Sequence, residues 1–141
     1  GADALRLYEM FLGPLEMAKP WSTKGIVGMT RFLDRVWLQS QKLKELQGNK
    51  TLVDVPGRSQ RIHGTIKKVT QDIENFHFNT AISTLMEYFN ERDFGSKILQ
   101  NGELENKEVD FTAFKNFLIL LLPFAPHLVS ECIEYLKFSV D

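Results

Sequence analysis

The stretch STKGIVGMTRFLDRVWLQSQKLKELQ, residues 22–47, decides the fold class. Its apolar residues recur at steps of three and four, the spacing that places side chains on one face of a helix. Ser22 is a suitable N-cap residue, and Gly48 is a suitable residue to end the helix. We therefore predict one long helix whose inward stripe is Ile26, Met29, Leu33, Val36, Trp37 and Leu43.

Helical patterns continue on both sides of this stretch. Gly13-Pro14, Pro56-Gly57 and Pro123 act as breaks between them. The other predicted helices cover residues 2–11, residues 59–75, a segment capped by Asn79 or Thr80, a segment from near Asp110 to Pro123, and a segment from Pro126 to about Lys137. No alternating strand pattern lasts long enough to predict a strand, although residues 51–55 come nearest. The expected fold is all-α, an antiparallel bundle of about five to six helices.

The inward faces of the other helices follow from the same spacing. We expect them to be Ile62, Ile66, Val69 and Ile73, then Ile82, Leu85, Met86 and Phe89, then Phe111, Phe114, Phe117, Leu118 and Leu121. Residues 92–108 are acidic and contain two glycines, so we predict a mobile loop. Its carboxylates, Glu103, Glu105 and Glu108 with Asp110 beyond it, are expected to lie in solvent.

No motif of covalent chemistry is present in the sequence. There is no Gly-rich phosphate loop, no Cys-x-x-Cys pair and no His-Glu-x-x-His run. The histidines, His63, His77 and His127, lie far apart, and we interpret them as surface or packing residues. Cys132 is the single cysteine and cannot form an internal disulfide, and the longest apolar run is too short to span a bilayer. We predict no catalytic residue, no cofactor and no metal in this segment.

Charge is distributed unevenly along the chain. Residues 1–68 hold 12 Lys and Arg against 6 Asp and Glu, whereas residues 69–141 hold 5 against 12. The net charge of −1 therefore hides a basic first half of +6 and an acidic second half of −7. A basic half can form a basic surface, which is the electrostatic feature expected of a nucleic-acid-binding protein.

A row of cations runs along the long predicted helix. Lys24, Arg31, Arg35 and Lys42 are spaced by 7, 4 and 7 residues, so they fall within about 40° of one another on the opposite side from the apolar stripe. The row is about 27 Å long, which suits contact with a phosphate backbone. Arg61, Lys67 and Lys68 are secondary candidates on the next helix. An ordinary solvated helix face remains the alternative, and Asp72 could pair with Lys68 one turn away.

Two tryptophans are further candidates for contact with bases. Trp37 belongs to the apolar stripe, which favours packing in the core, whereas for Trp21 stacking and packing are open.

Several short blocks, in order, resemble leucyl-tRNA synthetases of class I. Residues 1–11 are similar to the segment that closely follows the Lys-Met-Ser-Lys-Ser signature of that family. Tyr8-Glu9-Met10-Phe11 and Pro14-Leu15-Glu16 point to the bacterial or organellar form. The other matching blocks are Lys19-Pro20-Trp21-Ser22, residues 31–37, residues 65–69, residues 72–75, residues 78–82 and residues 123–128. Ile133 departs from the family, which usually has tryptophan there.

The resemblance implies a helical domain, historically called the anticodon-binding domain, that supports the tRNA beside a catalytic domain. It implies that the parent enzyme uses ATP and Mg²⁺ to attach leucine to its tRNA in the cytoplasm, with no membrane involved. Residues 1–141 would then be one domain, with residues 1–21 as the connection from the catalytic domain and residues 22–137 as the bundle. In such a domain, the apolar residues of the first helix are expected to form an exposed patch; they are Leu5, Leu7, Met10 and Phe11.

Two functions remain open from the sequence. The first is a domain that contacts the tRNA backbone through the cation row, with Arg31 and Arg35 at its centre. The second is a purely structural bundle that braces the catalytic domain without substantial contact with RNA.

Overall fold

The computed structural model describes residues 1–13, 22–48, 53–91, 94, 100–101, 103 and 108–138. The described residues form six α-helices, as the sequence predicts: α1 (Ala2–Phe11), α2 (Thr23–Gln47), α3 (Arg61–Glu74), α4 (Phe78–Glu91), α5 (Phe111–Leu121) and α6 (Pro126–Leu136). Two short strands, β1 (Val53–Asp54) and β2 (Glu108–Val109), were not predicted. They pair in parallel, with Val53 opposite Glu108. Trp21 lies outside the described residues.

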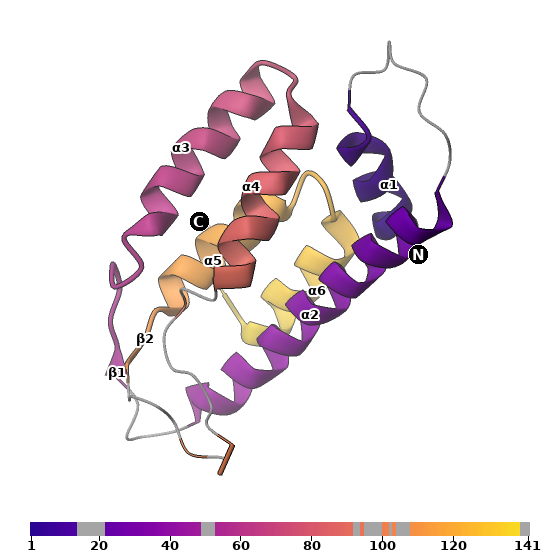
Figure 1. Ribbon diagram of the computed structural model, residues 1–141. Helices are drawn as coiled ribbons and strands as arrows, with labels where there is room; N and C mark the ends of the chain where they lie inside the picture. The colour runs from indigo at the N-terminus through magenta and orange to yellow at the C-terminus, as the bar shows by residue number, and fades with distance from the viewer. Residues whose placement is uncertain are drawn as a thin grey trace.

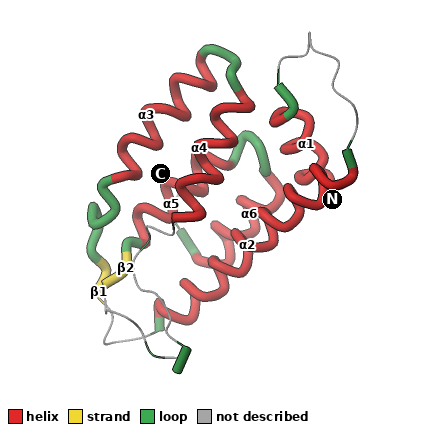
Figure 2. The backbone as a smooth tube through the Cα atoms, in the orientation of Figure 1, coloured by secondary structure: helices red, strands yellow, loops and turns green. Residues whose placement is uncertain are grey.

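The helices pack as two groups that share one core. α2 packs chiefly on α1 and α6, whereas α3 packs on α4 and α5. In Figures 1 and 2, α3 and α2 lie on opposite sides of the molecule, with α4, α5 and α6 between them. This arrangement determines which predicted site residues can act together.

The core is rich in phenylalanine. Phe32, Phe114, Phe117 and Phe124 are almost completely buried, and Phe32 meets Phe89 edge-on across α2 and α4 with ring centroids 5.6 Å apart. Most predicted inward residues are buried or half-buried, including Ile82, Leu85 and the α5 stripe. None of the described helices is long and apolar enough to cross a membrane.

Three sequence predictions need correction. Leu7 was expected in an exposed patch but is fully buried, because α1 packs its inward face against the bundle; Leu5 and Phe11 are exposed at 41% and 36%. The fourth helix begins at Phe78, before the predicted cap. Most residues of the predicted mobile loop are not among the described residues. Phe94, which is described, is buried, and its ring centroid lies 4.9 Å from that of Phe114.

Asp110 is a further correction. It was expected in solvent, yet it is fully buried and accepts hydrogen bonds from the backbone N–H groups of Gly57 (3.1 Å), Ser59 (3.0 Å) and Ala113 (2.9 Å). The residue caps α5 and also fastens the segment before α3 to it. A carboxylate can be buried at little cost when backbone donors satisfy its oxygens.

Asp3 of α1 caps α6 from a distance of more than 120 residues in sequence. Its carboxylate accepts hydrogen bonds from the backbone N–H groups of His127 (3.4 Å) and Leu128 (2.7 Å), and it lies 2.9 Å from Nδ1 of His127. These N–H groups belong to the first turn of α6, where Ala125 has no side chain that could cap them. The first and last described helices are therefore joined by one carboxylate.

The Asp3 link should depend on pH. Burial acts to raise the pKa of Asp3, but the hydrogen bonds from Leu128 and His127 and the charge of His127 together hold the pKa below its ordinary value of 3.8. The resulting stabilisation is fully present above that value and is lost as the pH falls through the folded-state pKa. Asp3→Asn should lower the free energy of unfolding by about 1 kcal/mol at pH 7. Urea unfolding of both proteins at pH 7, 5 and 3 tests this: the difference should shrink below pH 4, and an unchanged gap at pH 3 would contradict it.

Candidate RNA-binding face

The cation row on α2 is divided by the structure into free and engaged residues. Lys24 and Arg31 are exposed, and neither forms an ion pair or a hydrogen bond with any residue that the structure describes. They are seven residues apart, which places them about 10 Å apart along the helix axis. These two side chains can therefore turn toward a ligand without breaking an internal contact.

Arg35 is held by α4. Its guanidinium donates a hydrogen bond of 2.9 Å to Oδ1 of Asn90 and lies over the ring of Phe89, 5.7 Å from the ring centroid. The side chain remains exposed, so guanidinium N–H groups are left for a ligand. Arg35 is thus fixed in orientation between two helices, whereas Lys42 is half-buried near the C-terminal end of α2. Arg35 and Lys42 therefore continue the row beyond Arg31, but their side chains are less free to turn toward a ligand.

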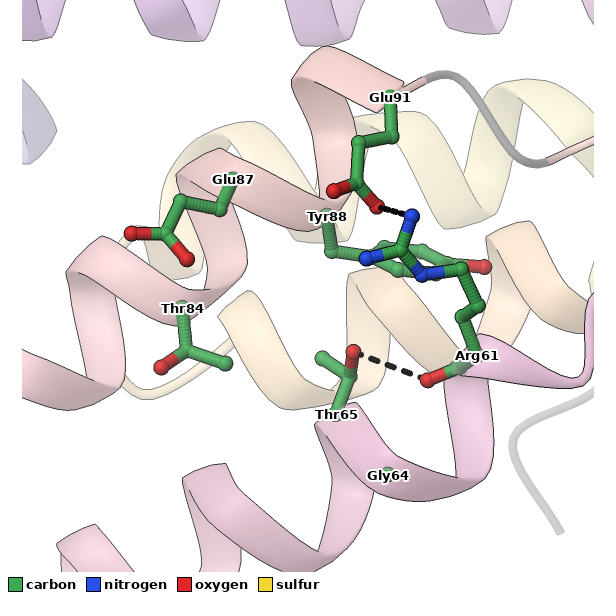
Figure 3. Close-up of a pocket in the computed structure, with 7 residues that line it drawn as sticks. All are labelled: Arg61, Gly64, Thr65, Thr84, Glu87, Tyr88 and Glu91. Atoms are coloured by element: carbon green, nitrogen blue, oxygen red, sulfur yellow. Dashed lines mark hydrogen bonds and ion pairs between the residues drawn. The ribbon is translucent and has the colours of Figure 1, made fainter.

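The secondary cations on α3 are mostly paired. Arg61 forms an ion pair with Glu91 of α4, and both residues line a pocket of about 320 Å³ (Figure 3). Gly64 lines the same pocket, and a β-carbon added there would meet no atom within 4 Å. Lys68 donates to both oxygens of Asp72 at 2.8 and 2.9 Å, which is the pairing considered as the alternative from the sequence. Lys67 is exposed and forms no ion pair with a described residue.

The Lys68 pair is reinforced by its surroundings. Burial acts to raise the pKa of Asp72, but the hydrogen bonds from Lys68 and Thr80 and the charges of Lys68 and His77 outweigh it, so the pKa lies below the ordinary value. Asp72 is therefore ionised at neutral pH, and Lys68 is engaged in a local pair.

The two sets of cations both contact the end of α4, because Arg35 binds Asn90 and Arg61 binds Glu91. α2 packs chiefly on α1 and α6, and α3 packs on α4 and α5, so the two helices that carry the cations lie on opposite sides of the molecule (Figure 1). The extension of the row onto α3 stays a prediction. Asn90, the partner of Arg35, was missed because sequence spacing places residues around one helix but does not identify the helix beside it.

The other residues that the sequence analysis considered are possible metal ligands, Cys132 and Trp37. Among the described residues, no group of three or more His, Cys, Asp or Glu side chains could hold a metal ion. Cys132 is buried between α2 and α6, and burial raises the pKa of its thiol despite a hydrogen bond with Ser40. Trp37 packs its ring against Tyr135 of α6, with centroids 5.1 Å apart, so the packing interpretation holds for it.

Comparison with known proteins identifies the family of this chain. Residues 59–139 match the family described as the anticodon-binding domain of tRNA ligase. A leucine–tRNA ligase of Borrelia hermsii is 42% identical over 137 residues, which are 96% of this chain. One of Chloroherpeton thalassium is 48% identical over 134 residues, or 93% of the chain. The chain belongs to the anticodon-binding domain family of tRNA ligases, and these relatives are leucine–tRNA ligases.

The solved structures agree with this assignment. A LeuRS of Agrobacterium radiobacter K84, determined as a ternary complex with tRNA and LeuAMS, has a TM-score of 0.75 and 27% identity over 99% of this chain. The chain spans 18% of that protein and about one seventh of the curated leucine–tRNA ligases, 14% of the Borrelia hermsii enzyme. Within the family, the chain corresponds to the anticodon-binding domain and not to the catalytic domain.

Proposed function

We propose that this chain is the part of a leucine–tRNA ligase that contacts the backbone of leucine-accepting tRNA, with Lys24 and Arg31 as its principal cations. The observation that carries the proposal is that both are exposed on one flank of α2 and lack internal partners among the described residues. Arg35 and Lys42 extend the contact, while Lys67 and the paired Arg61 and Lys68 are peripheral. The Agrobacterium relative was solved with tRNA bound, which supports tRNA as the partner.

The proposal extends to the whole enzyme. The parent would be a cytoplasmic ligase that uses ATP and Mg²⁺ to activate leucine and then transfers it to tRNA. That chemistry would take place in its catalytic domain, to which residues 1–21 would connect the bundle formed by residues 22–137. The described residues would contribute binding and orientation of the tRNA.

Reversing the two free charges should weaken tRNA binding in a salt-dependent manner. In a full-length ligase that carries this chain, Lys24→Glu with Arg31→Glu should reduce the slope of log affinity against log salt by about 2, one unit for each lost phosphate contact. The measurement is a titration with leucine tRNA at several salt concentrations, beside the Michaelis constant for tRNA. A slope and a Michaelis constant equal to those of the parent would contradict the site.

A matched control separates specific contact from net charge. Arg6→Glu with Lys115→Glu makes the same change in charge on α1 and α5, at residues that form no ion pair with described residues. This control should retain most of the salt slope. If both double variants weaken binding equally, the effect comes from the overall field of the molecule and not from the α2 row.

A structural brace is the second candidate function. It is favoured by the double anchoring of α1: Asp3 caps α6, and the hydroxyl of Tyr8 accepts a hydrogen bond of 2.8 Å from the backbone N–H of Ser22. These contacts would make α1 a rigid extension of the bundle toward a catalytic domain. On this reading, Asp3→Ala would lower the thermal stability of the parent enzyme, and the Lys24 and Arg31 reversals would leave tRNA affinity intact.

A further inference from the structure

The turn between α3 and α4 presents one aromatic side chain to solvent. Phe76 is 79% exposed, the largest exposed fraction of any large hydrophobic side chain that the structure describes. Its backbone is left-handed, with φ at 58°. For a residue with a β-carbon, this conformation costs about 1 kcal/mol or more. A strained backbone and an exposed ring are both unfavourable, and here they occur at the same residue.

Hydrogen bonds fix Phe76 in this conformation. The N–H of Phe76 donates to the carbonyl of Ile73 at 3.1 Å, and the N–H of His77 donates to the carbonyl of Asp72 at 2.7 Å. This pair of bonds is the Schellman motif that ends many helices, in which the left-handed position is usually glycine. Asn75 closes the same turn from its side chain, whose Nδ2 donates to the carbonyl of Gln71 at 2.9 Å. Phenylalanine therefore occupies a position where glycine would fit without strain.

The ring of Phe76 is also anchored from one side. It meets Phe78 nearly at right angles, with centroids 6.0 Å apart, and Phe78 meets the buried Phe124 at 6.2 Å. These contacts connect the turn to the core and leave most of the Phe76 ring in solvent. The ring is held in place before any ligand arrives, so little entropy would be lost on binding.

The residues around the Phe76 ring indicate which class of ligand the ring can bind. Asn75, His77 and Thr80 beside it are polar and exposed, and within residues 75–80 no other large apolar side chain is exposed. A protein interface needs a contiguous apolar centre of several residues. A single ring with polar neighbours instead matches one nucleobase, because unpaired bases stack on isolated aromatic side chains.

We propose that Phe76 stacks on a single unpaired nucleobase of the bound tRNA. This proposal rests on the tRNA-binding function proposed above and adds a contact on the α3–α4 turn, away from the cation row. The left-handed backbone and the contact with Phe78 hold the ring in position for the base.

Substitution of Phe76 should separate binding from stability. In a full-length ligase that carries this chain, Phe76→Ala should weaken binding of leucine tRNA about tenfold, with an unchanged salt slope because no charge is removed. Phe76→Gly should weaken binding equally while raising the midpoint of thermal unfolding of the 141-residue chain, since glycine relieves the backbone strain. Phe76→Trp should retain the affinity, and quenching of its fluorescence by tRNA, relative to the parent protein, would report the stack.

Two controls make the outcomes distinct. Val53→Ala removes another exposed apolar side chain, 55% exposed on β1, and should not change tRNA affinity. A blunt RNA duplex offers no unpaired base, so its binding should not change in Phe76→Ala. Equal losses for duplex and tRNA would overturn stacking, as would parental tRNA affinity in Phe76→Ala. If that variant instead destabilises the full-length enzyme without altering tRNA binding, the ring contacts protein. Failure of the Lys24 and Arg31 reversals alone would affect only the cation row.

Discussion

Asp110→Ala should lower the free energy of unfolding by about 3 kcal/mol, one of the two largest effects expected of a single substitution here. The change removes the N-cap of α5 and leaves the backbone N–H groups of Gly57, Ser59 and Ala113 without their acceptor. The site of Asp110 is fully buried, so water does not readily replace the lost carboxylate. Because the other oxygen of this carboxylate, Oδ2, binds the segment before α3, the start of that helix should loosen as well.

Urea unfolding followed by circular dichroism measures this loss, and Asp54→Ala is the matched control. Asp54 also accepts a hydrogen bond from the first residue of α5, Phe111, at 3.2 Å, but its side chain is exposed. Its removal should cost less than about 1 kcal/mol. Equal losses in the two variants would mean that burial of the Asp110 carboxylate contributes nothing beyond a surface cap.

Gly25→Ala should destabilise the domain by about 2 kcal/mol, within the range of overpacked cores. A methyl group at Gly25 would overlap the ring of Tyr8, whose nearest atoms include Cδ2 at 3.1 Å. The ring has little room to move, because it is 2% exposed and its hydroxyl accepts the hydrogen bond from Ser22. The methyl group must therefore push α1 away from α2.

Gly28→Ala provides the control on the same helix. A β-carbon at Gly28 meets no atom within 4 Å, so alanine there should stabilise α2 by about 0.5 to 1 kcal/mol through its better helix propensity. Thermal unfolding should shift in opposite directions in the two variants. A stabilising Gly25→Ala would show that α1 does not pack closely on α2 in solution.

The helices could be predicted because their signals are local. Ser22 accepts a hydrogen bond from the N–H of Gly25 as an N-cap, and Pro126 stands in the first turn of α6, where its missing N–H costs nothing. The start of α4 was misplaced because Phe76 takes a left-handed conformation that sequence alone assigns to glycine. The pairing of β1 with β2 joins residues far apart in the chain and depends on where the helices bring them.

The candidate site was predictable only in part. Helical spacing places Lys24, Arg31 and Arg35 on one flank of α2, and all three are exposed. That Arg35 is tied to Asn90 depends on the packing of α4, which no local pattern encodes. Asp110 was misjudged because neighbouring acids suggested solvent, although its position just before an apolar helix is also that of an N-cap.

The contact between Asp3 and α6 also bears on how the chain folds as it is synthesised. Asp3 precedes Leu128 by 125 residues, so at about 5 to 20 residues per second roughly 6 to 25 seconds separate the appearance of the carboxylate from that of the helix it caps. Throughout this interval, α1 lacks its partner on α6, and the first turn of α6 finds an acceptor already waiting when it emerges. Of the helices that the structure describes, α1 is therefore made before the others and is among the last to complete its contacts, because its link to α6 has to wait until α6 has been made.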